Sequence, residues 1–262
     1  MNLNLKNRNA FIGGSSKGIG FAAAVELANS EANVTLVGRN EELLKQKLSE
    51  LPVLSETQIH DYVVLDYTDI ENLKTVVNQL VSKRDYQILV NNTGGPAGGD
   101  IINESQEKFE SIFQQHLIAN QILTQAFVPA MKKAGFGRIV NVISVSVKQP
   151  LVGLGVSNTI RWAVAAWAKT LSKEIAQFGI TVNNVLPGYT LTGRLDEVLT
   201  QKSAASNIAR SEIENQILTN IPTGKFATAE EVGAAVAFLC SPIAASINGV
   251  NLPVDGGLSM SL

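Results

Sequence analysis

Apolar and polar positions along this chain follow two alternating patterns. Short apolar runs rich in Val, Ile and Leu recur at intervals and are typical of strands buried on both faces. They predict strands over residues 10–13, 33–37, 62–65, 88–91, 138–143, 181–186 and 250–253. Between these runs, apolar residues recur three and four positions apart, which is the spacing of an amphipathic helix. This spacing predicts helices over residues 19–30, 41–50, 70–82, 105–133, 157–178 and 229–239.

The order of these elements predicts the fold class. Strands separated by helices form crossover connections, which build a parallel sheet with helices on both faces. No linker or internal repeat divides the chain, so we expect an α/β fold: one doubly wound Rossmann domain over residues 1–262 with a seven-stranded parallel sheet. Residues 190–225 interrupt the alternation with a polar stretch rich in Ser, Asn and Gln. We expect either a substrate loop or lid there, or a long surface connection.

Composition and charge exclude several classes of protein. The chain of 262 residues has 21 Lys and Arg against 23 Asp and Glu, so its net charge is −2. This balance gives no electrostatic reason to expect a nucleic-acid or anionic-membrane partner. Cys240 is the single cysteine, which excludes an intrachain disulfide and a cysteine zinc site, and we expect no metal. The apolar residues before Cys240 predict a buried thiol.

One uncharged stretch, residues 233–254, is long enough to span a bilayer. Pro242 and the turn dipeptide Asn248-Gly249 divide it, so we expect a short helix, a turn and a short strand instead. The amino-terminal residues show no apolar run of the kind that signal peptides carry. We therefore expect a soluble, cytoplasmic protein.

A glycine-rich segment, GGSSKGIG at residues 13–20, follows the first predicted strand and opens the first predicted helix. Glycines at this place let the backbone turn sharply and approach a pyrophosphate, which the helix N–H groups and dipole then bind. A glycine-rich turn without a ligand is the alternative, but the strand–turn–helix context favours a nucleotide site. The candidate contacts are Gly14, Ser16, Lys17, Gly18, Ile19 and Gly20.

The end of the second predicted strand indicates which nucleotide is bound. An acidic residue there would hydrogen-bond the ribose hydroxyls and repel a 2′-phosphate. The chain has Gly38 and Arg39 instead, and Lys17 can reach the same region. Because arginine pairs well with phosphate, we expect NADP(H) to be preferred over NAD(H). The alternative is that Arg39 and Lys17 are solvated loop charges.

Five motifs in order resemble those of the short-chain dehydrogenase/reductase family and, within it, the β-ketoacyl-acyl-carrier-protein reductase-like group. The glycine loop is similar to TGxxxGxG with Gly13 in place of Thr, and residues 91–94, NNTG, are similar to NNAG. Residues 187–192 match PGxxxT, residues 254–257 match VDGG, and Asp66 stands where the family contacts adenine. The resemblance covers essentially the whole chain. It implies further cofactor contacts at Asp66, Asn92, Gly94, Arg161, Pro187, Gly188, Thr190 and Thr192.

The catalytic positions depart from the family pattern. The family uses a Ser, a Tyr on the following helix that protonates the carbonyl oxygen, a Lys one helical turn later, and an Asn on the preceding helix. The matching positions here are His116, Ser144, Ser157 and Arg161, so only the Ser is retained. No Tyr-x-x-x-Lys occurs anywhere in the chain. Loss of a positioned general acid typically lowers a rate about 10²- to 10⁴-fold.

Other residues could take over part of this chemistry. Ser157 cannot replace the Tyr because an aliphatic hydroxyl is a far weaker acid, whereas Arg161 could hold the ribose and stabilise an oxyanion. The ordinary pKa of histidine suits His116 as a proton donor near neutral pH, unless it is a buried structural residue. Tyr189 stands on a loop that faces the nicotinamide in the family, so it could supply the proton or pack in a lid.

Two functions stay open. The first is an NADP(H)-dependent oxidoreductase, 3-oxoacyl-reductase-like, with a small-molecule carbonyl or alcohol substrate; the second is an inactive NADP(H)-binding homologue that acts as a sensor or partner subunit. We favour the first because the cofactor motifs are kept. Lyase or dehalogenase chemistry ranks last, since family members that make this change tend to lose the glycine loop and keep the Tyr. Trp162, Trp167 and the alanines between them predict a helix-pair contact and a homo-oligomer, dimer or tetramer.

Overall fold

A parallel sheet forms the centre of the computed structural model, which describes residues 3–261. Its strand order is β3-β2-β1-β4-β5-β6-β7, and every pairing is parallel. From β1 the chain adds β2 and β3 on one side and then β4 to β7 on the other. This change of side makes the sheet doubly wound, which confirms the predicted fold class. The strands are β1 (Asn9–Ile12), β2 (Asn33–Gly38), β3 (Asp61–Val64), β4 (Ile88–Asn91), β5 (Gly137–Val142), β6 (Ile180–Pro187) and β7 (Asn251–Val254).

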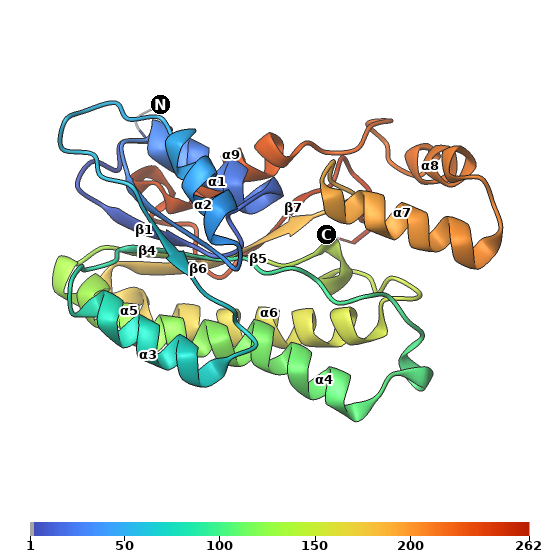
Figure 1. The fold of residues 1–262 in the computed structure, drawn as a ribbon, viewed down its shortest axis with the longest axis horizontal. Helices are drawn as coiled ribbons and strands as arrows, with labels where there is room; N and C mark the ends of the chain where they lie inside the picture. Colours follow the sequence, from blue (N-terminus) through green and yellow to red (C-terminus); the bar gives the residue numbers. More distant parts are fainter. Residues whose placement is uncertain (1–2, 262) are drawn as a thin grey trace.

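Helices cover both faces of this sheet. One layer holds α1, α2 and α9, and the other holds α3, α4, α5 and α6, while α7 and α8 stand beyond one end of the strands (Figure 1). The helices are α1 (Gly18–Asn29), α2 (Glu41–Ser49), α3 (Ile70–Val81), α4 (Gln106–Phe113), α5 (Ala119–Ala134), α6 (Gly155–Ile175), α7 (Gly193–Ser206), α8 (Arg210–Thr219) and α9 (Ala229–Cys240). Each predicted strand is found, and its ends differ from the prediction by no more than one residue.

The apolar runs form strands because both faces of the central sheet are covered. Every residue of β4, β5 and β6 is buried, whereas the edge strands β3 and β7 keep exposed positions. One core cluster lies between the sheet and α1 with α9, and a second lies between the sheet and α3, α5 and α6. Two filled layers hold the carboxyl ends of the central strands in fixed register, which is where α/β sheets bind ligands.

Two predicted segments are wrong in detail. The single helix expected over residues 105–133 is divided by a five-residue π-helical turn, Gln114–Ile118, into α4 and α5. The stretch over residues 190–225, for which a substrate loop or lid or a long surface connection is expected, contains α7 and α8, two helices that the apolar spacing does not predict. These helices form because each buries a narrow apolar stripe against the other, although their remaining surface is polar. The stripe consists of Leu195, Leu199, Ile213, Ile217 and Ile221.

The uncharged stretch over residues 233–254 folds as the sequence predicts. It runs through α9, a 3₁₀ turn over Pro242–Ala244 and strand β7, and Cys240 is fully buried at the end of α9. Burial raises the pKa of the Cys240 thiol to about 12, so the thiol is protonated and unreactive. Over residues 3–261, no helix has both the length and the apolar character needed to cross a bilayer.

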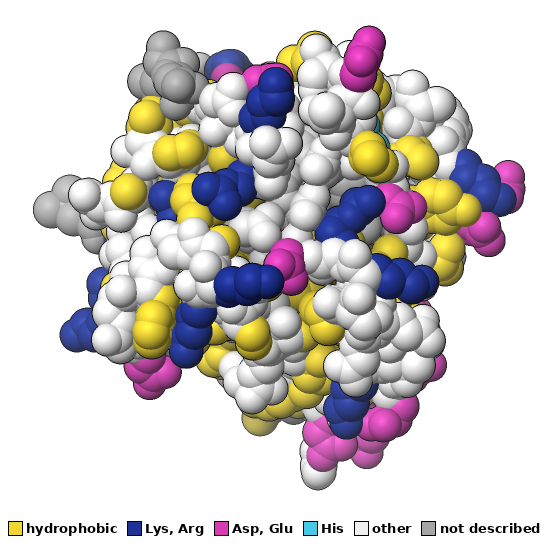
Figure 2. All heavy atoms as spheres, turned by 90° about the vertical axis from the view of Figure 1, so that its left-hand side faces the viewer, with side chains coloured by type: hydrophobic (Ala, Val, Ile, Leu, Met, Phe, Trp, Pro, Cys, Tyr) yellow, Lys and Arg dark blue, Asp and Glu magenta, His cyan; other side chains and the backbone are white. Residues whose placement is uncertain are grey.

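The face at the left of Figure 1 lies at the opposite end of the strands from α7 and α8. Figure 2 shows this face directly. Its basic and acidic side chains lie among one another and among small apolar areas. The face therefore shows no continuous basic surface of the kind that binds nucleic acid.

Candidate nucleotide and active site

The glycine loop between β1 and α1 has the backbone that an anion site requires. Gly14 and Gly18 have φ of 54° and 58°, a region that favours glycine. A Cβ on Gly20 would lie 2.4 Å from the Gly14 carbonyl oxygen, so a side chain there would break the turn. Helix α1 begins at Gly18 with no side-chain cap and no acidic residue in its first turn. Its first N–H groups are therefore left for a ligand such as a pyrophosphate.

Asn92 fixes this loop from the neighbouring strand. Its side-chain amide donates to the carbonyl oxygens of Gly13 at 3.0 Å and Gly14 at 3.3 Å. Gly13 itself has no room for a side chain, because its Cβ would lie 2.7 Å from the Asn92 carbonyl oxygen and 2.8 Å from the Tyr67 hydroxyl. The tyrosine hydroxyl thus fills the space beside the position where the family has a threonine. That hydroxyl is buried without a hydrogen-bond partner, and burial raises its pKa.

The PGxxxT segment closes over the same loop. A Cβ on Gly18 would lie 3.3 Å from the Thr192 methyl carbon, so the start of α7 and the glycine loop are in contact. Within the segment, the Thr192 hydroxyl donates to the Thr190 carbonyl, and the Thr190 hydroxyl donates to the Gly188 carbonyl at 3.2 Å. Gly188 packs against Asp255 of the VDGG motif, because a Cβ on Gly188 would lie 2.8 Å from the Asp255 Cβ. These contacts place the segment that follows Pro187 beside the phosphate-binding loop.

The expected adenosine end is open and carries the predicted cations. Lys17 and Arg39 are exposed, and Arg39 reaches Asp66 at 3.9 Å. The Asp66 carboxylate also accepts from the N–H and hydroxyl of Thr68. A Cβ on Gly38 would touch Ser16 at 3.4 Å, so Ser16 lies directly against the end of β2. Ser16, Lys17 and Arg39 therefore border one region, which Asp66 also reaches.

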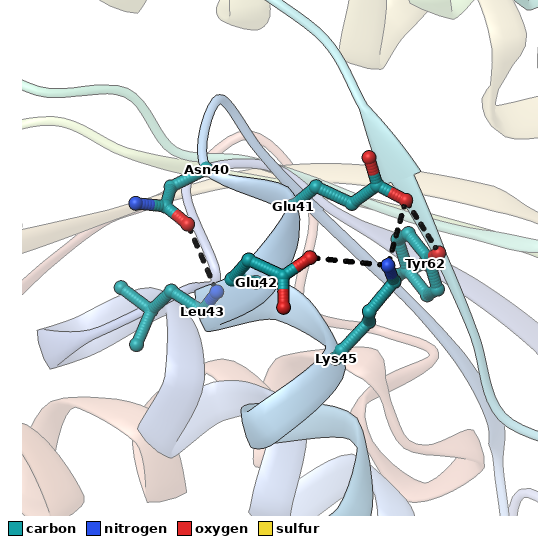
Figure 3. A network of polar contacts seen from close by, with 6 residues as sticks. All are labelled: Asn40, Glu41, Glu42, Leu43, Lys45 and Tyr62. Carbon is teal, nitrogen blue, oxygen red and sulfur yellow. Dashed lines mark hydrogen bonds and ion pairs between the residues drawn. The ribbon is translucent and has the colours of Figure 1, made fainter.

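Acidic residues at the start of α2 turn away from Arg39. Figure 3 shows Lys45 between Glu41 and Glu42, at 3.1 and 3.2 Å, and the Tyr62 hydroxyl donating to Glu41 at 3.0 Å. Asn40 caps the helix by accepting from the Leu43 N–H at 2.9 Å. Both glutamates thus have partners of their own, whereas the carboxylate that pairs with Arg39 is that of Asp66.

Arg161 lies at the centre of the expected active site. From α6 it donates to the carbonyl oxygens of Val142 at 3.2 Å and Ile143 at 2.8 Å, directly before Ser144 at the end of β5. Its Nε donates to the Ser157 hydroxyl at 3.3 Å. Burial, together with the nearby charge of Arg194, lowers the pKa of Arg161 to about 10. The guanidinium is therefore charged at neutral pH, and its described partners are all neutral.

His116 lies in the π-helical turn, a feature that is frequent at functional sites. It is 5% exposed, and its Nδ1 shares a hydrogen bond of 2.7 Å with the Thr93 hydroxyl. Burial and the charge of Arg161 lower the pKa of His116 to about 3, and a hydrogen bond to the Gly94 backbone opposes this only in part. The imidazole is therefore uncharged at neutral pH.

Ser144 ends the extended segment of β5 and accepts from the Ser146 N–H at 3.1 Å. The pair Ser144 and Ser157 thus lies on either side of Arg161, one at the strand end and one on α6. The four tyrosines are placed elsewhere. Tyr62, Tyr67 and Tyr86 lie at α2, behind the glycine loop and in the core beside Phe127, respectively.

Tyr189 packs among the helices that follow the PGxxxT segment. Its ring contacts Phe226 and lies below the Lys202 ammonium group, with centroid distances of 6.2 and 5.9 Å. It lines a groove of about 530 Å³ together with residues of α7 and α8. The described contacts thus connect Tyr189 with the α7–α8 cluster, and they connect His116, Ser157 and Arg161 with the strand ends.

Sequence reasoning missed two residues of this site. Thr93 was noted only as a departure from NNAG, yet it is the hydrogen-bond partner of His116. Arg194 received no role, yet its Nη2 donates to the Pro96 carbonyl at 2.5 Å and brings α7 to the loop after β4. An Arg two residues after PGxxxT is the available signal, but nothing local to it shows which loop it reaches.

A doubly wound sheet with a glycine-rich turn at a helix N-terminus defines the Rossmann-type class of α/β folds. A family model described as enoyl-(acyl carrier protein) reductase matches residues 14–259. A similar protein, the 3-oxoacyl-[acyl-carrier-protein] reductase FabG of Haemophilus influenzae, is 33% identical over 98% of this chain and 100% of its own length. The chain therefore belongs to the short-chain dehydrogenase/reductase family.

Other similar proteins are also reductases. The NADPH-dependent reductase BacG of Bacillus subtilis is 28% identical over 98% of this chain and all of its own length. The crystal structure of YwfH, an NADPH-dependent reductase involved in bacilysin biosynthesis, superposes with a TM-score of 0.91 at 26% identity, covering 97% and 99% of the two chains. L-sorbose reductase from Gluconobacter frateurii, solved with NADPH and L-sorbose, gives 0.91 at 28% identity over the full length of both chains.

Proposed function

We propose that this protein is an NADP(H)-dependent oxidoreductase that interconverts a small-molecule carbonyl compound and its alcohol. One observation carries the proposal. The charged Arg161 guanidinium is held beside Ser144 by two strand-end carbonyls and has no carboxylate partner among the described residues. A hydrogen-bond donor fixed in this way can stabilise negative charge that develops on a substrate oxygen. The reductase names of the relatives support the same reaction class.

The residues present fit a bound dinucleotide. The glycine loop would hold the pyrophosphate at the start of α1, and Thr192 would close over it. Ser16, Lys17 and Arg39 would bind a 2′-phosphate, which favours NADP(H), as do the NADPH complexes of the structural relatives. When bound, the dinucleotide supplies the reducing equivalent for the carbonyl carbon. Asn92 holds the loop in its binding shape.

The chain's own groups define how the substrate oxygen is handled. We assign Ser144 to hydrogen-bond the carbonyl oxygen and Arg161 to stabilise the oxyanion, in place of the family's tyrosine and lysine. His116 is neutral at pH 7, so it acts as a hydrogen-bonding group rather than as an acid. Without a phenol at position 157, protonation of the product oxygen is expected to limit the rate.

A non-catalytic NADP(H)-binding protein is the second candidate function. It is favoured by the absence of a described contact between any tyrosine and Ser144 within residues 3–261, and by the low pKa of His116. A sensor or partner subunit of this kind would bind NADP(H) tightly and would not turn it over.

NADPH oxidation, measured across ketones and β-ketoacyl thioesters, separates the two functions. For the oxidoreductase, Arg161→Gln and Ser144→Ala should each lower kcat about 10²- to 10³-fold, the usual loss for one oxyanion donor. Tyr189→Phe tests the remaining candidate for the proton donor, and His116→Ala tests the hydrogen-bonding role of the imidazole. NADPH affinity, measured by fluorescence titration, is the control for folding. Tight NADPH binding without turnover of any substrate would instead establish the second function.

A further inference from the structure

Two arginines from distant parts of the chain converge on one glycine. Gly95 follows the NNTG segment at the end of β4. The point where its Cβ would lie is 3.4 Å from Arg161 Nη2 on α6 and 4.0 Å from Arg194 Nε on α7. The two guanidinium groups therefore flank the same small volume. Since glycine contributes no side chain, no side chain at position 95 separates the two guanidinium groups.

The charge on this pair is poorly compensated within the described residues. Arg161 meets only neutral partners, namely two carbonyl oxygens and the Ser157 hydroxyl. Arg194 has one carboxylate partner, Glu197 at 3.1 Å, which is itself 58% exposed on the surface of α7. A partly buried cation next to a second cation is costly unless an anion accompanies it.

The neighbouring groups leave the position positively charged. His116 lies close enough for the charge of Arg161 to act on its pKa, and it is neutral at pH 7. Thr93 and the Gly94 backbone, which contact this ring, carry no charge. The same volume adjoins the carbonyls of Val142 and Ile143, directly before Ser144. An anionic group bound there would lie next to the residue assigned to the substrate oxygen.

We propose that Arg161 and Arg194 together bind a carboxylate of the substrate, so that the natural substrate is an oxo acid or the corresponding hydroxy acid. The inference rests on the proposed function, because it places this acid in the same site. Arginine is suited to the role since its planar fork matches a carboxylate in two parallel hydrogen bonds. In balanced form, the oxo acid, NADPH and one proton give the hydroxy acid and NADP⁺.

The cofactor's pyrophosphate is the other source of the same chemistry. It has its own site at the N-terminus of α1, where Gly14, Gly18 and Gly20 form the turn. The arginine pair instead contacts the end of β5 and the loop after β4, through the carbonyl oxygens of Ile143 and Pro96. This placement favours a substrate carboxylate, and the experiment distinguishes the two sources.

The test compares acids with their neutral methyl esters. Binding of acetoacetate, 2-oxobutyrate and the methyl ester of each is measured by calorimetry, with NADP⁺ at saturation and without it. We expect the wild-type protein to bind at least one acid about tenfold or more tightly than its ester. About tenfold is the smallest gain in affinity that a charge-assisted hydrogen bond normally gives. Arg194→Gln should reduce that preference to about twofold, and Arg194→Lys should keep part of it. The NADP⁺ Kd should not change in either variant.

Arg210→Gln is the matched control, since Arg210 lies at the start of α8 and is already paired with Asp196 and Glu214. It should leave both the preference and the NADP⁺ Kd as in the wild type. Equal binding of acid and ester, or binding of neither, overturns the proposal. So does an Arg194→Gln variant that loses NADP⁺ affinity and keeps its acid preference, because the pair would then serve the cofactor. Failure of NADP⁺ to bind the wild type would count against the proposed function, while the acid preference is still measured without it.

Discussion

Stability against pH offers a direct check on the electrostatics of His116. Its pKa is about 3 in the folded protein against an ordinary value of 6.5. The unfolded chain therefore takes up a proton near pH 6.5 that the folded protein refuses, and the free energy of unfolding falls as the pH falls. The stability is fully present above pH 6.5 and is lost progressively down to pH 3.

The magnitude follows from the same values. Each pKa unit corresponds to about 1.4 kcal/mol, so this one residue should remove about 2 kcal/mol between pH 7.5 and pH 5. His116→Asn puts the family's usual residue at this position. Between pH 7.5 and pH 5, this variant should lose about 2 kcal/mol less unfolding free energy than the wild type. Urea unfolding of both proteins at several pH values measures the difference. His60, the other histidine of the chain, is present in both proteins, so its contribution cancels.

The comparison rests on the slope with pH rather than on absolute stability, so a variant that is less stable at every pH still gives an answer. His116→Gln provides a second uncharged replacement. Proton-detected NMR gives an independent reading, because only two histidine rings can titrate. The His116 ring should stay neutral at pH 5. Parallel slopes in wild type and variants, or a ring that titrates near pH 6.5, would refute the assignment of a desolvated imidazole.

Four further substitutions, with one control, test the cofactor site and the residues behind its glycine loop. Arg39→Asp should weaken NADPH binding about 10- to 100-fold, the worth of one charged hydrogen bond, and should strengthen NADH binding; an unchanged NADPH Kd in fluorescence titration contradicts this. Gly20→Ala puts a carbon 2.4 Å from a loop carbonyl oxygen, so it should lower NADPH affinity and reduce the free energy of unfolding by about 1–3 kcal/mol, with a lower Tm. Gly193→Ala is the control: its new carbon meets no described atom within 4 Å, so both quantities should stay unchanged. Tyr67→Phe removes a buried hydroxyl that has no partner, so the free energy of unfolding should stay level or rise by up to about 1 kcal/mol in denaturant titrations. Gly13→Ala should cost less in the Tyr67→Phe background, and equal costs in both backgrounds would count against the contact.

The fold could be predicted because its signals are local. Each central strand is a continuous apolar run, and the glycine loop joins a strand to a helix within a few residues. The α7 and α8 helices were missed because each has only a narrow apolar stripe, and such helices gain their stability from the partner that covers the stripe. The π-helical turn at Gln114–Ile118 was missed because one extra residue per turn hardly alters the apolar spacing.

The candidate site divides in the same way. The positions of Ser144, Ser157 and Arg161 follow from motif order alone, and the structure places Ser157 and Arg161 in contact. The pKa of His116 could not be read from the sequence, because it depends on burial and on a charge that another helix supplies. Arg194 was missed for a related reason: its partner Pro96 lies 98 residues away in the chain.

The substitutions at the catalytic positions form a connected set rather than separate losses. With Ser at position 157, the hydroxyl is short enough to accept from Arg161 Nε, and the guanidinium extends to the end of β5. Burial, together with the same charge, keeps His116 neutral, and Thr93 rather than Ala supplies that ring with a hydrogen-bond partner. A centre that had merely lost its tyrosine would have no reason to retain a partly buried cation, because such a group lowers stability until an anion or oxyanion meets it. Burying the Arg161 cation lowers the free energy of unfolding. Because a bound anion or oxyanion would offset this, we propose that the site still stabilises negative charge.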